Sequence, residues 1–207
     1  MIPRVIKPAD EATASYDRII DLSHRGLASG AVAILPAEGI YGLHLSAAVP
    51  GAISSLRKIK GERSPRPFII LIGSPAQLTD FADPPDDAVS EIISMAWPGP
   101  VTILLPARSD IPTELTKEGL VALRCPGSDF LRELSSLLPG PLLTTSANPT
   151  GQPAPARIDQ LDPLIFEAAD LIIDGGQLPG YSSTLISFDQ LGKPRVLRSG
   201  PWLPPHA

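Results

Sequence analysis

The sequence has 207 residues, of which 43% are hydrophobic and 19% are charged. This balance is typical of a globular protein of one domain and excludes an intrinsically disordered chain. The net charge of −5 at pH 7 argues against a dedicated nucleic-acid-binding protein, because such proteins usually carry a basic domain or stripe.

The spacing of hydrophobic residues predicts helices and strands in irregular alternation along the chain. Ser74, Asp86 and Ser128 are residues that commonly cap the start of a helix, and Gly30 is placed to end the first one. The expected helices cover 10–29, 50–60, 75–81, 86–96, 129–138 and 158–169. The expected strands cover 31–35, 43–47, 68–72, 101–105, 120–124, 142–145, 171–174, 184–188 and 194–198.

Several of these strands follow one another without a helix between them. The fold class is therefore α/β, with one mixed, twisted β-sheet flanked by helices rather than a regular doubly wound sheet. No repeat and no linker divides the chain, so we expect one domain over 10–200. The proline-rich residues 201–207 are expected to form a loosely ordered tail.

The compartment is indicated by three features of the sequence. No apolar stretch approaches the ~20 residues that a membrane helix needs, and the first residues lack the apolar core of a secretion signal. The single cysteine, Cys125, cannot form an internal disulfide. We therefore expect a cytoplasmic protein with no membrane partner.

The most informative segment begins at Ser146, directly after the apolar strand 142–145, and reads Ser-Ala-Asn-Pro-Thr-Gly. Open α/β sheets bind ligands beyond the carboxyl ends of their strands. Ser146 and Asn148 supply hydrogen-bond donors and acceptors there, and Gly151 permits the positive φ of a tight turn. Ordinary turn chemistry is the alternative interpretation of this segment taken alone.

Further segments accompany it in a fixed order along the chain. They are Pro36-Ala37-Glu38-Gly39-Ile40-Tyr41-Gly42-Leu43, Ile59-Lys60-Gly61-Glu62-Arg63, Trp97-Pro98-Gly99-Pro100-Val101-Thr102, Val121-Ala122-Leu123-Arg124-Cys125-Pro126, Ser183-Thr184-Leu185-Ile186 and Leu197-Arg198-Ser199-Gly200. This ordered set, over roughly residues 15–200, resembles the YrdC-like family, whose best-known members are threonylcarbamoyl-AMP synthases. The resemblance implies one α/β domain with a concave, charged cavity beside the sheet.

The resemblance also implies a nucleotidyltransferase, an L-threonylcarbamoyladenylate synthase. L-threonine and bicarbonate would form an N-carboxylated amino acid that attacks the α-phosphate of ATP and releases pyrophosphate, with Mg²⁺ bound to ATP. The product serves N6-threonylcarbamoyladenosine (t6A) modification of tRNA, through t6A-transfer proteins that act downstream. No cluster of histidine and cysteine has metal-ligand spacing, so we expect no metal site made by the protein itself.

Site residues follow from the resemblance, position by position. Lys60 and Arg63 are expected to be catalytic, by neutralising charge on the phosphates. The expected ATP-binding residues are Lys58, Lys60, Arg63, Ser146, Asn148 and Arg198. The expected threonine-binding residues are Arg124, Thr144 and Ser183. For Arg198 a structural salt bridge, and for Ser183 a turn cap, are the alternatives.

Four positions depart from the family pattern, one of them Ser187, which stands where the family has aspartate. Ala37 and Gly39 stand where the family has threonine, and Glu62 stands where it has arginine, which leaves Arg63 one place late. These departures motivate a second hypothesis, a paralogue that uses another amine or carbamoyl donor. A third hypothesis is a non-catalytic module that binds double-stranded RNA or tRNA, motivated by the basic residues between 57 and 66; a solvated helix face would explain the same run.

Overall fold

The computed structural model describes residues 5–7, 15–61 and 68–205. Glu62, Arg63 and Arg66 lie outside the described residues. The described strands are β1 (Val5–Ile6), β2 (Ala33–Pro36), β3 (Tyr41–Ser46), β4 (Ile69–Leu71), β5 (Val101–Pro106), β6 (Thr116–Lys117), β7 (Leu120–Arg124), β8 (Leu142–Ser146), β9 (Leu171–Ile173), β10 (Thr184–Phe188) and β11 (Pro194–Arg198). The α-helices are α1 (Tyr16–Ala28), α2 (Ala52–Lys60), α3 (Asp87–Ala96), α4 (Asp129–Leu137) and α5 (Pro163–Ala168).

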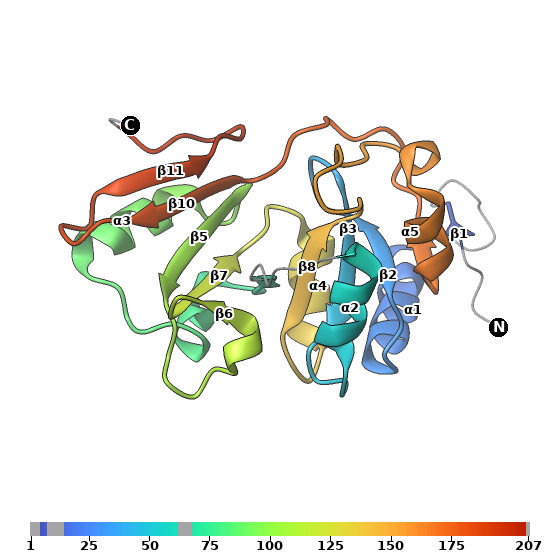
Figure 1. Cartoon of the computed structure of the whole chain (residues 1–207), viewed down its shortest axis with the longest axis horizontal. Coiled ribbons are helices and arrows are strands. Elements are labelled where there is room, and N and C mark those ends of the chain that lie inside the picture. Colours follow the sequence, from blue (N-terminus) through green and yellow to red (C-terminus); the bar gives the residue numbers. More distant parts are fainter. Residues whose placement is uncertain (1–4, 8–14, 62–67, 206–207) are drawn as a thin grey trace.

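One sheet runs through the whole molecule in the order β1-β9-β2-β3-β8-β4-β7-β5-β10-β11, with β6 beside β7 (Figure 1). Its pairing is mixed. The β4–β7, β5–β10, β2–β9 and β1–β9 pairs are parallel, whereas β8 is antiparallel to both of its neighbours, β3 and β4. The predicted fold class, a mixed sheet flanked by helices, is therefore confirmed.

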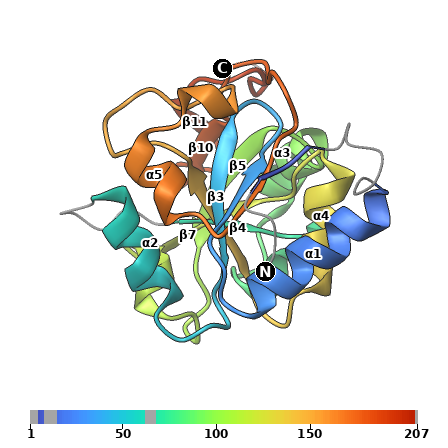
Figure 2. The ribbon, with the colours of Figure 1, turned by 90° about the vertical axis from the view of Figure 1, so that its right-hand side faces the viewer.

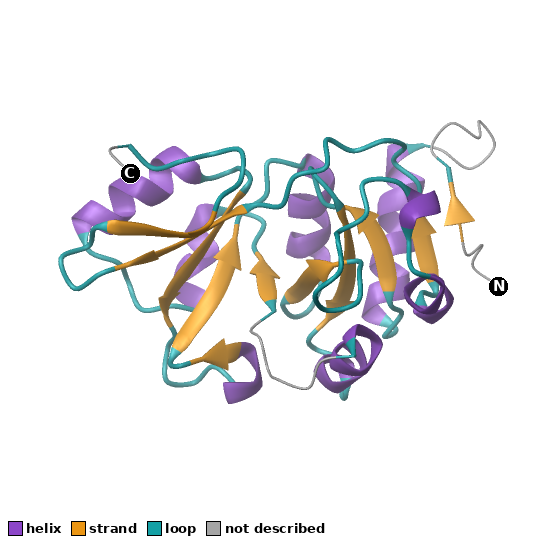
Figure 3. Cartoon of the chain, turned by 45° about the horizontal axis from the view of Figure 1, so that its top comes forward, coloured by secondary structure: helices purple, strands orange, loops and turns teal. Residues whose placement is uncertain are grey.

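Helices cover both faces of the sheet (Figures 2 and 3). Helices α1 and α4 lie together on one face, where Leu27 and Leu134 share a buried cluster with Leu142 of β8. Helices α2 and α5 lie on the other face, and their residues Leu56 and Ile165 belong to the second cluster. Successive residues of a strand point to opposite faces, so the neighbour of Leu142 in β8, Leu143, belongs to that second cluster.

The capping side chains predicted from the sequence are in place. The side chains of Asp86 and Ser128 accept hydrogen bonds from backbone N–H groups of α3 and α4. Ser74 forms a capping box, but the turn that it begins, Pro75–Asp80, is a short 3₁₀ helix. A 3₁₀ turn closes bonds over three residues and suits short segments.

One predicted helix, 158–169, is two separate elements. A 3₁₀ turn covers Ile158–Gln160, and α5 begins at Pro163. The carboxylate of Asp162 accepts the N–H of Leu164 and so starts a new helix. Pro163 has no N–H with which to continue the earlier turn. The short strands β1 and β6, of two residues each, carry too little periodicity for a prediction from sequence.

Two contacts lie beyond residues 10 and 200, the predicted limits of the domain. Strand β1 pairs with β9, so residues before the limit extend the sheet. After it, the Thr184 hydroxyl donates to the Trp202 carbonyl at 2.5 Å, and the N–H of Trp202 donates back at 3.3 Å. Within the described residues, none of the helices has the length and apolar character needed to cross a bilayer.

Candidate functional site

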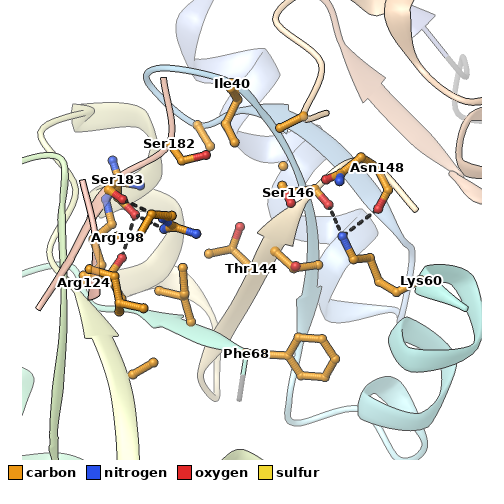
Figure 4. Close-up of a pocket in the computed structure, with 18 of the residues that line it drawn as sticks. Ile40, Lys60, Phe68, Arg124, Thr144, Ser146, Asn148, Ser182, Ser183 and Arg198 are labelled. Atoms are coloured by element: carbon orange, nitrogen blue, oxygen red, sulfur yellow. Dashed lines mark hydrogen bonds between the residues drawn. The ribbon is translucent and has the colours of Figure 1, made fainter. Parts of the chain in front are cut away.

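A cavity of about 570 Å³ opens over the middle of the sheet (Figure 4). Its floor is set by strand register: Thr144 of β8 lies opposite Ile69 of β4, Ile69 opposite Ala122 of β7, and Ala122 opposite Leu104 of β5. All four residues line the cavity. Because directly opposed residues in adjacent strands share one face, four strands contribute one side chain each to a continuous floor.

Lys60 forms one wall of the cavity, at the last position of α2. Its side chain is buried, and its ammonium donates to the carbonyl oxygens of Ser146 at 2.8 Å and Asn148 at 2.6 Å. Backbone contacts reinforce this connection, since the N–H and the hydroxyl of Thr150 both donate to the Lys60 carbonyl at 3.2 Å. The end of α2 is thus held against the turn that follows β8.

The turn after β8 has the geometry that its sequence predicts. Gly151 has a φ of +89°, which glycine adopts without strain. The side-chain amide of Asn148 donates to the carbonyls of Pro149 at 3.0 Å and Gln152 at 2.6 Å. Asn148 therefore shapes the turn with its amide and holds Lys60 with its carbonyl.

Arg124 lies across the cavity from Lys60, at the end of β7 (Figure 4). Its guanidinium forms an ion pair with the carboxylate of Glu38 and donates to the carbonyl of Gly99 at 3.3 Å. Burial, together with the nearby Arg198 cation, lowers the pKa of Arg124 to about 10. Glu38 stands at φ +69° in the turn between β2 and β3, so a turn from the far side of the cavity supplies the counter-charge.

Arg198 and Ser183 lie beside Arg124. Arg198 donates through Nε to the Ser183 carbonyl and through Nη2 to the Ser183 hydroxyl, both at 3.1 Å. The Ser183 hydroxyl also shares a hydrogen bond of 2.8 Å with the buried hydroxyl of Thr102. Burial lowers the pKa of Arg198. Arg198 thus contacts the expected threonine-binding Ser183 and forms no salt bridge among the described residues.

The charge of the cavity is opposite to that of the chain. Four cationic residues line it, namely Lys60, Lys117, Arg124 and Arg198, whereas the described lining residues include no aspartate or glutamate. A concave site lined by one sign of charge concentrates ligands of the other sign. The cavity is therefore suited to a small molecule with several negative charges.

Most of the residues predicted from the sequence gather in this cavity. Those that line it are Lys60, Arg124, Thr144, Ser146, Asn148, Ser183 and Arg198. Lys58 is exposed on α2 and is not among the lining residues. Arg63 lies outside the described residues. Arg57, from the same basic run, is half-buried, donates to the Glu114 carbonyl at 3.0 Å and lies over the Phe68 ring.

Three residues of the site were not predicted from the sequence: Glu38, Thr102 and Lys117. Glu38 belongs to the motif at 36–43 and Thr102 to the motif at 97–102. Their place in these motifs is the signal from which they could have been predicted. Lys117 belongs to the two-residue strand β6, which no pattern predicts. Its place in the cavity follows only from the pairing of β6 with β7.

The two positions that lack the family's threonine differ in their surroundings. Ala37 lines the cavity, so an added hydroxyl there would face a ligand. At Gly39 a Cβ atom would collide with the backbone carbonyl of Tyr181. The absence of a side chain at Gly39 is therefore a packing requirement of the loop that carries Tyr181, and Ala37 alone alters the surface offered to a ligand.

The chain is thus an α/β protein with a mixed sheet of this order and a cationic cavity at its centre, which suits an anionic ligand. The family model Sua5/YciO/YrdC, described as "Telomere recombination", matches residues 25–200. The chain belongs to this family. The membership confirms the resemblance that the ordered motifs indicated.

Curated relatives carry the name threonylcarbamoyl-AMP synthase. The rat protein is 28% identical over 182 residues, which span 84% of this chain and 64% of that protein. The protein of Pyrococcus abyssi is 32% identical over 174 residues, 83% of this chain and 51% of its own length. The chain thus spans between half and two-thirds of these relatives.

A solved structure is similar over nearly the whole chain. It is P. abyssi Sua5 complexed with L-threonine, with a TM-score of 0.80 and 27% identity over 95% of this chain and 57% of that one. The fold described above is therefore the fold of the family.

Proposed function

We propose that the protein is an ATP-dependent threonylcarbamoyl-AMP synthase, which joins L-threonine, bicarbonate and ATP and releases pyrophosphate. The observation that carries this proposal is the cavity lined by four cations and no carboxylate among its described lining residues. ATP, bicarbonate and the carboxylate of threonine are all anions. The names of the relatives and the L-threonine complex of P. abyssi Sua5 support the same substrates.

The proposed reaction needs no nucleophile from the protein. The amine of threonine takes up bicarbonate to give a carbamate with loss of water, and a carbamate oxygen attacks the α-phosphate of ATP. The bond from that phosphorus to the bridging oxygen breaks, and pyrophosphate leaves. Positioning and charge neutralisation are enough to accelerate such a step.

We assign the wall formed by Lys60, Ser146 and Asn148 to ATP, together with Lys58 and Arg63 as further phosphate contacts. Arg124, Thr144 and Ser183 are assigned to threonine. Arg198 donates to Ser183, so it is assigned to the junction of the two, where the α-phosphate meets the carbamate. Catalysis is assigned to Lys60 and Arg63, which would offset charge on the phosphates.

Mg²⁺ would enter with ATP. The described residues contain no group of three or more histidine, cysteine, aspartate or glutamate side chains that could hold a metal ion, and the donors around the cavity are amines, guanidiniums, amides and hydroxyls. The phosphate oxygens of ATP would thus be the principal ligands of the ion, which would supply further neutralisation of their charge.

The product is a mixed anhydride that a second enzyme must consume. We propose that downstream t6A-transfer proteins carry its threonylcarbamoyl group to tRNA, and that the whole sequence takes place in the cytoplasm.

The test is pyrophosphate release from ATP in the presence of bicarbonate and each amino acid in turn. The proposal predicts release that requires both bicarbonate and threonine. Release with valine equal to that with threonine would favour the paralogue hypothesis, which the side chain of Ala37 in the cavity motivates. No release with any amino acid, combined with salt-sensitive tRNA binding without ATP, would favour the RNA-binding module.

A further inference from the structure

His44 is a buried histidine beside Thr144, one of the residues expected to bind threonine in the cavity. It belongs to β3, lies opposite Thr144 of β8 in register, and is fully buried. Unlike Thr144, it is not among the residues that line the cavity. Its ring therefore has access to a ligand only through a neighbouring side chain.

The two ring nitrogens of His44 have different partners. Nδ1 lies 3.0 Å from the carbonyl oxygen of Gly42, and Nε2 lies 3.1 Å from the hydroxyl oxygen of Thr144. A carbonyl only accepts, so the 3.0 Å contact with Gly42 places a proton on Nδ1. The carbonyl of Ala33, opposite His44 in β2, is a second acceptor near the ring. Burial lowers the pKa of His44 to about 4, so the ring is neutral near pH 7 and Nε2 carries none.

The protonation of the ring fixes the direction of the next hydrogen bond. An unprotonated Nε2 is an acceptor, so the Thr144 hydroxyl must donate its proton to it. The hydroxyl has one proton, and this contact uses it. What Thr144 offers to the cavity is then a lone pair, and its hydroxyl acts there as an acceptor.

Gly42 makes this arrangement possible. A Cβ atom at position 42 would lie 2.8 Å from Cε1 of His44 and 3.1 Å from Oγ1 of Thr144, closer than side-chain atoms pack. The missing side chain leaves the space that the imidazole ring occupies. Gly42, His44 and Thr144 thus form one unit that sets the direction of a single hydroxyl.

To bind an amino acid the cavity needs hydrogen-bond acceptors as well as cations. Its cationic side chains, Lys60, Arg124 and Arg198, are donors only, and they suit phosphate and carboxylate. Threonine also carries donors, its amine N–H groups and its hydroxyl, and these require an oxygen or nitrogen lone pair. Thr144, at the middle of the floor (Figure 4), provides one.

We propose that His44 is a positioning residue that holds the Thr144 hydroxyl as a hydrogen-bond acceptor for an N–H or O–H donor of the amino-acid substrate. This inference rests on the proposed function for the identity of the ligand. It assigns His44 a role in substrate selection although the residue touches no substrate.

The first test reads the ring itself, in the folded wild-type protein. Nitrogen NMR of the three histidines, assigned with a His44→Gln variant, should show His44 neutral at pH 7 with the proton on Nδ1. A proton on Nε2, or a charged ring at pH 7, would overturn this inference and leave the proposed function standing.

The second test is a double-mutant cycle on threonine affinity, measured by calorimetry with His44→Leu, Thr144→Val and the double variant. Each single change should weaken binding about three- to tenfold, the share of one hydrogen bond. The double variant should lose no more than either single one. Additive losses, or unchanged affinity in His44→Leu, would overturn the inference, because a residue that only packs has no reason to be coupled to one hydroxyl.

Two further arms complete the cycle. His44→Gln offers an amide oxygen in place of Nε2 and should retain most of the affinity, with His24→Gln on α1 as the matched control. Binding of valine, which lacks the hydroxyl, identifies the substrate group that donates to Thr144. If His44→Leu lowers the affinity for threonine alone, Thr144 binds the substrate hydroxyl. If it lowers the affinity for both amino acids, Thr144 binds the amine. A wild-type protein that binds no amino acid would overturn the proposed function and the ligand named here, whatever the ring shows.

Discussion

The contacts of Lys60 lead to a prediction that separates it from its neighbour Lys58. Both lysines lie in the last turn of α2, so replacing either by methionine removes the same charge from the same helix end. Lys60 is buried and donates to two carbonyls, whereas Lys58 is exposed. The two substitutions should therefore have very different consequences.

The size of the difference follows from the two hydrogen bonds. A hydrogen bond to a charged group contributes about 1.5–3 kcal/mol, and Lys60→Met leaves the carbonyls of Ser146 and Asn148 without this donor. We expect the free energy of unfolding to fall by about 3 kcal/mol in Lys60→Met and by less than about 0.5 kcal/mol in Lys58→Met. Urea unfolding followed by circular dichroism measures both.

ATP binding provides the second measurement. If Lys60 also faces the phosphates, Lys60→Met should weaken ATP binding by a factor that grows as the salt concentration is lowered, because salt screens the attraction between the protein's cations and the solvent-accessible phosphates of ATP. Calorimetric titrations at two ionic strengths give this factor. Equal unfolding free energies for the two variants would refute the structural part of the argument, and an ATP affinity untouched in Lys60→Met would refute the phosphate contact.

Three other outcomes are expected. Gly39→Ala should destabilise the protein by about 1–3 kcal/mol through the collision with Tyr181, whereas Ala37→Ser, which adds a hydroxyl inside the cavity, should leave the melting temperature unchanged; equal effects would contradict this placement. Burial raises the pKa of the Cys125 thiol to about 11, so a thiol reagent at pH 8 should react slowly with the folded protein and rapidly once urea unfolds it. Burial lowers the pKa of His44 to about 4, so between pH 6.5 and about 4 the unfolded chain binds a proton that the folded chain does not. The free energy of unfolding should therefore fall by about 2 kcal/mol between pH 7 and 5. Urea unfolding curves measure this fall, which His44→Gln should reduce.

The elements with strong local signals were predictable from the sequence. Asp86 and Ser128 cap the helices that they were expected to cap, because capping depends on residues three positions apart. The fold class followed from the irregular order of helices and strands. Strand β6 and the division of 158–169 were not predicted, since a two-residue strand and a new cap inside an apolar stretch leave little periodic pattern.

The site was predictable where a motif carries its chemistry along the chain. Lys60, Ser146 and Asn148 line the same cavity, as the ordered motifs indicated, although their roles toward a ligand remain predictions. The ion pair between Glu38 and Arg124 could not be predicted from the sequence, because only the tertiary fold brings the turn of Glu38 to the strand end of Arg124. The same is true of His44, whose partner Thr144 is 100 residues away.

The order of strands has a consequence for how the site forms during synthesis. One half of the sheet holds β1, β9, β2, β3 and β8, and the other holds β4, β7, β5, β10 and β11. Each half is assembled from two separate stretches of chain, so the polypeptide crosses between the halves three times. They meet where Thr144 of β8 lies opposite Ile69 of β4, at the floor of the cavity. Contacts between distant stretches slow folding, and domains fold as their chain leaves the ribosome. Ser183 directly precedes β10 and Arg198 ends β11. A nascent chain therefore has no complete binding site until β11 has been made, and ligand binding reports completed folding.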